Sequence, residues 1–234
     1  MIVNLIRSKT FSLRDGTRGR LFVEVPDVAG FVRFLDAPFQ QFSLEHLIFF
    51  SEVSLANFLR RQGFSSLLGV GGARAHSLSS TMPVLSFVAE KTEMAAGPFV
   101  RDEVTGPALS SYIEASAALE NSVGRVIDKL VETQQPVVVW GVGTHTAHLV
   151  AKRGLGAANI LSFVDSNPRY HGKKLNGVPI ESPATLKSRA ESVVISSRVF
   201  QREIVRQLRE DLGCRNDLIL LYDDGGQNET CDVV

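Results

Sequence analysis

Two glycines after a short apolar run form the candidate binding element of the sequence. Gly141 and Gly143 follow residues 137–140, which read Val-Val-Val-Trp, and Thr144 stands where a helix is expected to begin. Glycines in such a turn let the backbone approach a ligand, and the first N–H groups of a helix attract a phosphate. The spacing therefore predicts a phosphate-binding turn.

An acidic residue follows at the distance that a dinucleotide site requires. Asp165 comes directly after the next apolar run, about 20 residues beyond the turn, where an acid can hold a ribose hydroxyl. The third glycine of a dinucleotide motif is absent, and Ala147 stands one position late. A tight turn that binds no ligand therefore stays open as the alternative.

Glu45 and His46 are the candidate acid–base pair. They lie between Phe42 and the apolar run 47–50. A histidine titrates near neutral pH, and an adjacent carboxylate could orient it to remove a proton from a substrate. Taken alone, however, a histidine beside an aromatic run more often has a structural role.

No metal site is expected from the spacing of the histidines and cysteines. His145 and His148 are one helical turn apart, but a metal needs a third ligand in register and none is evident. Cys214 and Cys231 are the only cysteines, so neither a disulfide framework nor a zinc cluster is expected.

Short motifs in two stretches of the chain carry a resemblance to one family. In the first stretch they are Leu21-Phe22-Val23-Glu24-Val25-Pro26-Asp27, Glu45-His46-Leu47, Phe50-Ser51, Ser54-Leu55 and Gly63-Phe64. In the second they are Trp140-Gly141-Val142-Gly143, Phe163-Val164-Asp165-Ser166-Asn167-Pro168, Gly172-Lys173, Gly177-Val178-Pro179-Ile180, Ser182-Pro183, Ile195-Ser196-Ser197 and Gln201-Arg202-Glu203-Ile204. Together they resemble the SAM-dependent C-methyltransferases that modify sugars.

The resemblance and the pattern of expected elements together predict an α/β fold with four parts. Residues 1–105 would be a partial class I methyltransferase domain made of its closing strands and helices, and residues 106–135 a helical connector. Residues 136–222 would form a Rossmann-like domain with a parallel sheet, and 223–234 a tail.

The resemblance also implies a function. The chain would be the C-terminal portion of a SAM-dependent C-methyltransferase that acts on a nucleotide-sugar-like small molecule. The family's Glu-His pair falls on Glu45 and His46, with the histidine as general base. Residues of the Rossmann-like domain would help to hold the substrate, and the candidates are Gly141, Gly143, Thr144 and Asp165.

The sequence departs from the family at its front. The family's SAM-binding glycine loop, acidic ribose ligand and zinc module should all precede Leu21, and only twenty residues do. The family's two motif tyrosines fall on Ser43 and Phe49. We therefore expect the chain to lack a SAM site and to be inactive alone. The alternatives are a non-catalytic nucleotide or nucleotide-sugar binding module, and a structural subunit of a split methyltransferase.

The periodicity of the first half predicts three strands and two helices, followed by a connector and a long helix. Residues 21–25 and 64–70 are expected to be strands, as are residues 84–89. A short helix is expected over residues 28–35, and a clearer one after Ser51, with Gly63 at its end. Residues 97–107, rich in Gly and Pro, mark a connector, and a long helical pattern covers residues 110–134.

Strands and helices are expected to alternate in the second half. The strands are residues 137–140, 160–164, 193–196 and 218–221, and the helices are residues 145–152, 184–189 and 201–212. Such alternation predicts a parallel sheet covered on both faces.

The composition limits the possible binding partners and the cellular location of the protein. The 25 basic and 25 acidic residues cancel, which argues against nucleic acid and anionic membranes as partners. No signal peptide or apolar run of about 18 residues is evident, so a cytoplasmic protein is expected. An upstream methyltransferase polypeptide, or a second copy of the chain, is the expected protein partner.

Overall fold

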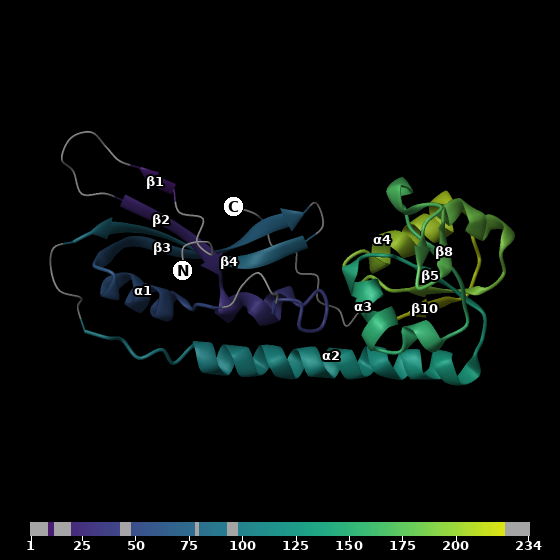
Figure 1. Cartoon of the computed structure of the whole chain (residues 1–234), viewed down its shortest axis with the longest axis horizontal. Helices are drawn as coiled ribbons and strands as arrows, with labels where there is room; N and C mark the ends of the chain where they lie inside the picture. The colour runs from purple at the N-terminus through teal and green to yellow at the C-terminus, as the bar shows by residue number, and fades with distance from the viewer. Residues whose placement is uncertain (1–8, 12–19, 43–47, 78–79, 93–97, 223–234) are drawn as a thin grey trace. The chain divides into compact units, whose positions relative to one another are not determined.

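The computed structural model describes residues 9–11, 20–42, 48–77, 80–92 and 98–222 (Figure 1). The chain forms two compact units, residues 1–117 and 118–234, and the division falls inside helix α2 (Thr105–Thr133). Within the described part of the chain, no helix combines the length and apolar character that a membrane crossing needs.

The first unit contains a four-stranded antiparallel sheet. Its strands are β1 (Lys9–Phe11), β2 (Arg20–Pro26), β3 (Phe64–Ser77) and β4 (Ser80–Lys91), and they lie in the order β1-β2-β4-β3. The expected strands are confirmed, although β3 and β4 are longer than predicted and pair as a hairpin. The expected helix at residues 28–35 is a 3-10 helix, η2 (Val28–Phe34), capped by the side chain of Asp27.

Helix α1 (Glu52–Arg61) begins and ends as its sequence predicts. The hydroxyl of Ser51 accepts a hydrogen bond from the backbone N–H of Ser54, and Ser54 Oγ accepts one from the Ser51 N–H in return. Gly63 follows the helix with φ +77°, a conformation that favours glycine. The apolar side of α1 lies on the sheet, where Leu55 and Leu59 pack in one cluster with Val23, Val25, Leu85, Phe87 and Ala89.

Polar side chains fix the segment that leads into α2. The buried amide of Asn57 donates to the backbone oxygen of Val100 at 2.6 Å and accepts from its N–H at 3.2 Å. Asp102 accepts hydrogen bonds from Ser51 Oγ and Thr105 Oγ1, both at 2.7 Å. Burial alone would raise the pKa of Asp102, but these hydrogen bonds outweigh it and hold the pKa well below its usual value.

Helix α2 starts at Thr105, earlier than the predicted start at residue 110. Gly106 and Pro107 lie in its first turn, although they were expected to precede the helix. A proline is tolerated at that position, because the first N–H groups of a helix have no intrahelical partner to lose.

The second unit contains a six-stranded sheet in the order β10-β9-β5-β6-β8-β7. Five strands are parallel: β5 (Val137–Trp140), β6 (Ile160–Val164), β8 (Val178–Glu181), β9 (Ser192–Ile195) and β10 (Leu218–Leu220). The edge strand β7 (Lys174–Leu175) pairs antiparallel with β8. The parallel sheet is confirmed, but the β7–β8 hairpin was not predicted.

Helices connect these strands. They are α3 (Thr144–Lys152), α4 (Gln201–Arg206), the π-helical turn η6 (Gln207–Asp211) and the 3-10 turns η3 (Leu155–Ala157), η4 (Pro168–Tyr170) and η5 (Pro183–Ser188). The helix expected at 184–189 is therefore a 3-10 turn. The one expected at 201–212 is α-helical only in its first half.

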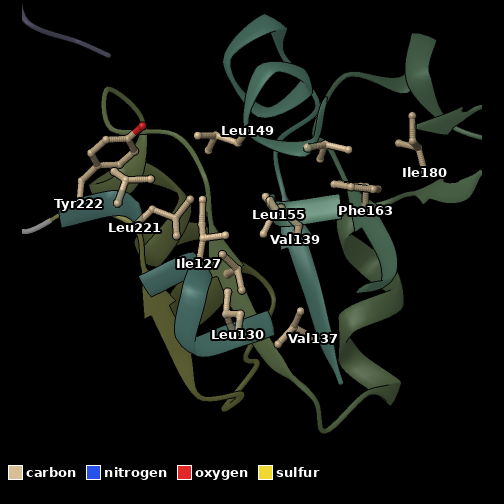
Figure 2. Close-up of a cluster of buried hydrophobic side chains, with 13 residues drawn as sticks. Ile127, Leu130, Val137, Val139, Leu149, Leu155, Phe163, Ile180, Leu221 and Tyr222 are labelled. Atoms are coloured by element: carbon tan, nitrogen blue, oxygen red, sulfur yellow. The ribbon is translucent and has the colours of Figure 1, made fainter. Parts of the chain in front are cut away.

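Both faces of the parallel sheet are buried, as its apolar runs predict. Along β5, Val137 and Val139 point into one cluster with α3 and the second half of α2, while Val138 and Trp140 point into another with η5 and α4. Figure 2 shows the first cluster, in which Ile127 and Leu130 of α2 lie near Val137 and Leu221. Burial on both faces therefore assigns alternate side chains of β5 to opposite clusters.

Candidate functional site

The carboxyl edge of the parallel sheet gathers the predicted binding residues. The strand order reverses there: the chain goes from β5 outward through β6 and β8, then returns to β9 on the other side of β5. In open sheets of this kind, ligands bind outside the carboxyl ends of the strands at such a reversal. Gly141, Gly143 and Thr144 lie directly after β5, at this point.

Gly141 adopts a backbone conformation that few other residues tolerate. Its φ is +110°, and a Cβ at this position would lie 2.9 Å from Ser196 Oγ. The turn is therefore held against the residue that follows β9. Gly143 differs, because it has φ −65° at the N-cap of α3 and a Cβ there would meet no atom within 4 Å. Its missing side chain leaves the first turn of α3 open.

A chain of hydroxyl groups lies beneath the turn. Ser196 Oγ donates to the Trp140 backbone oxygen at 2.8 Å, so the hydroxyl of Thr146 donates to Ser196 Oγ, at 2.7 Å. Both side chains are almost fully buried. These bonds tie the first turn of α3 to the ends of β5 and β9. Neither residue was predicted; the polar pair Ser196-Ser197 after an apolar run was the available signal.

Asp165 lies at the same edge, after β6, but its carboxylate already binds backbone. Its Oδ2 accepts from the Val142 N–H at 3.1 Å and its Oδ1 from the Asn167 N–H at 2.8 Å. Asp165 therefore lies beside the glycine turn. These two hydrogen bonds stabilise the turn and use one acceptor site on each carboxylate oxygen. A ribose hydroxyl could bind only to the acceptor sites that are left.

His145 faces Tyr222 across the edge. The phenol of Tyr222 and Nε2 of His145 form a hydrogen bond, although the two residues are far apart in sequence. Burial, reinforced by the charge of His148, lowers the pKa of His145 to about 4, so the imidazole is neutral at physiological pH. Arg198, which follows β9, is close enough for its charge to act on the Tyr222 phenol.

The predicted acid–base pair, Glu45 and His46, lies outside the described residues, as does Ser43. Phe42, directly before this stretch, and Phe49, shortly after it, belong to one aromatic cluster, with 5.7 Å between their ring centroids. Tyr112 of α2 packs against Phe42 at 5.2 Å and accepts a hydrogen bond from the Gln41 N–H. Among the described residues, no group of three metal-ligating side chains occurs.

The second unit is thus an α/β unit with a mainly parallel sheet and a polar carboxyl edge. A family model described as "C2185-like, N-terminal" matches residues 133–220, which run from the end of α2 to the end of β10. This part of the chain is similar to that family. No curated protein matches the chain.

Proposed function

We propose that the second unit is a Rossmann-like domain that binds a phosphate-bearing small molecule of the nucleotide-sugar class at its carboxyl edge. The observation that carries the proposal is the open first turn of α3 beside Gly143, at the point where the strand order reverses. Unpaired N–H groups and the positive end of the helix dipole favour an anion there.

The charges near the turn support an anionic ligand. Arg198 adds a positive charge on the β9 side, and the carboxylate of Asp165, beside the turn, accepts hydrogen bonds from two backbone N–H groups. The missing third glycine, with Ala147 one position late, favours a nucleotide sugar over a redox dinucleotide.

The experiment is amide chemical-shift mapping of residues 136–222 with uridine diphosphate glucose and with NAD in parallel. We expect shifts around Gly141, Gly143 and Thr144 with the nucleotide sugar. Shifts confined to NAD would make the domain a dinucleotide module. The absence of shifts with either ligand would leave the glycines as turn residues.

A matched pair of variants separates binding from folding. Gly143→Asp puts a carboxylate at the N-cap, where Asp is favoured and the space is open, yet the charge repels a phosphate. Gly143→Asn has the same shape without the charge. Either side chain can cap the first N–H groups of α3, so the charge is read from the difference between the two variants. We expect both to fold and Gly143→Asp to bind about tenfold or more weakly than Gly143→Asn. Equal affinity in both would argue against an anion at this turn.

A second candidate function is the C-terminal portion of a SAM-dependent C-methyltransferase. It is favoured by helix α1, which follows Phe50-Ser51 and is closed by Gly63-Phe64, as the turn and helix of that family imply. In this role Glu45 and His46 would act only with a polypeptide that supplies the methyl donor site. Calorimetric titration of SAM tests this, because micromolar binding by the chain alone would contradict it.

A further inference from the structure

Tyr222 holds the imidazole of His145 from a fixed position. Its ring is 1% exposed and belongs to the core cluster of the second unit, where Figure 2 shows it next to Leu221. Gln201, the first residue of α4, donates from Nε2 to the Tyr222 backbone oxygen at 2.9 Å. Tyr222 therefore connects the first turns of α3 and α4 at the carboxyl edge.

The direction of the hydrogen bond follows from what each group can donate. Burial raises the pKa of the Tyr222 phenol, so the phenol keeps its proton. Within the described residues, this hydroxyl forms its hydrogen bond with His145 Nε2. The O–H consequently donates and Nε2 accepts, which puts the single proton of a neutral imidazole on Nδ1.

The Nδ1–H group then needs an acceptor of its own. No described residue accepts a hydrogen bond from it, and His145, the second residue of α3, is only partly buried. Backbone N–H groups of the same helical turn have no intrahelical partner. A phosphate group at this turn would offer several acceptor oxygens to these donors.

We propose that Tyr222 is a positioning residue that fixes His145 in the Nδ1–H tautomer, and that this N–H donates to a phosphate oxygen of the ligand. The inference rests on the proposed function of the second unit and specifies its ligand class. A neutral donor suits a pyrophosphate diester, whose phosphates carry one charge each, better than a terminal monoester with nearly two. The charged or titratable neighbours of the pair are His148, on the next turn of α3, and Arg198.

The tautomer is measured on the full chain without ligand, from the ¹⁵N chemical shifts of the imidazole. We expect His145 to show a protonated Nδ1 and an unprotonated Nε2. Tyr222→Phe should mix the two tautomers, whereas the control Tyr170→Phe, which removes a partly exposed phenol elsewhere, should not. A protonated Nε2 in the unaltered chain, or an unchanged tautomer in Tyr222→Phe, would overturn the positioning role.

Binding of uridine diphosphate glucose tests the second half of the inference. His145→Asn keeps an N–H donor near the position of Nδ1, while His145→Gln keeps only a partner for the phenol. We expect His145→Asn to bind within about threefold of the unaltered chain, and His145→Gln and Tyr222→Phe to bind about five- to tenfold more weakly. Equal affinities in all variants would overturn the donor role. These two histidine variants also decide the question if Tyr222→Phe does not fold.

The outcomes separate the inference from the proposed function. If the unaltered chain binds neither uridine diphosphate glucose nor inorganic phosphate, the proposed function and the donor role both fail, while the tautomer still decides the role of Tyr222. If inorganic phosphate binds as tightly as the pyrophosphate diester, the site binds anions and the inferred ligand class is wrong.

Discussion

Thr146 and Ser196, fifty residues apart in sequence, share a buried hydrogen bond of 2.7 Å beneath the glycine turn. Ser196 Oγ in turn donates a hydrogen bond to the backbone oxygen of Trp140. The ends of two neighbouring strands and the start of α3 are therefore held together by side-chain hydroxyls. The candidate site is built on this connection.

Removal of either hydroxyl should destabilise the second unit, and the two effects should not add. Ser196→Ala removes two hydrogen bonds and Thr146→Val one, so we expect losses of about 1–3 kcal/mol and about 1 kcal/mol in the free energy of unfolding. The double variant should cost less than the sum, because the two residues share a bond. Urea unfolding of all four proteins measures the coupling; strict additivity would mean that the bond does not form.

Gly141 and Gly143 should respond oppositely to alanine. Gly141→Ala forces a positive φ and a close contact with Ser196 Oγ, and should lower stability by roughly 1–3 kcal/mol. Gly143→Ala meets open space and an ordinary φ, so its stability should change by less than about 1 kcal/mol. Thermal unfolding distinguishes the two. Similar losses in both variants would contradict the described turn.

The amide of Asn57 should control the order of the segment around Val100. Asn57→Asp keeps the acceptor for the Val100 N–H but loses the donor to its backbone oxygen, and it buries a charge. We expect a loss of about 2–4 kcal/mol and faster hydrogen exchange at Val100. Asn121→Asp, at an exposed position of α2, is the matched control. An unchanged exchange rate at Val100 would show that the contact carries little energy.

His145 should make the second unit sensitive to mild acid. Its folded pKa of about 4 lies below the usual value near 6.5, so the unfolded chain binds the proton more readily. The stability is fully present above about pH 6.5 and is lost as the pH falls towards 4. We expect the melting temperature of the unaltered chain to fall more than that of His145→Gln over this range. Parallel curves for the two proteins would argue against a neutral, buried imidazole.

The sequence predicted the elements whose signal is local. The strand at 160–164 is reproduced residue for residue, because a β-branched and aromatic run between turn residues has few other conformations. The N-cap at Ser51 was also predicted correctly, because a serine directly before a helical pattern is a local signal. The β7–β8 hairpin was missed, because Pro179 argues against a strand unless that strand lies near an edge.

The candidate site was predicted only as far as its turn. Gly141, Gly143 and Asp165 were identified because their spacing along one βαβ unit is itself a motif. Ser196 and Tyr222 were not, since each meets its partner only after the chain has crossed the sheet. Contacts of that kind depend on strand order, which no short pattern encodes.

The short strand β7 also bears on how the protein behaves at high concentration. A parallel sheet that ended on β8 would offer a row of free backbone groups on which another chain could assemble. Two residues, Lys174 and Leu175, cover that row, and the exposed Lys174 side chain adds a charge at the rim. Replacing Lys174 with an apolar residue that favours strands would remove this charge from the sheet edge. We expect that change to promote aggregation, even though no core contact changes.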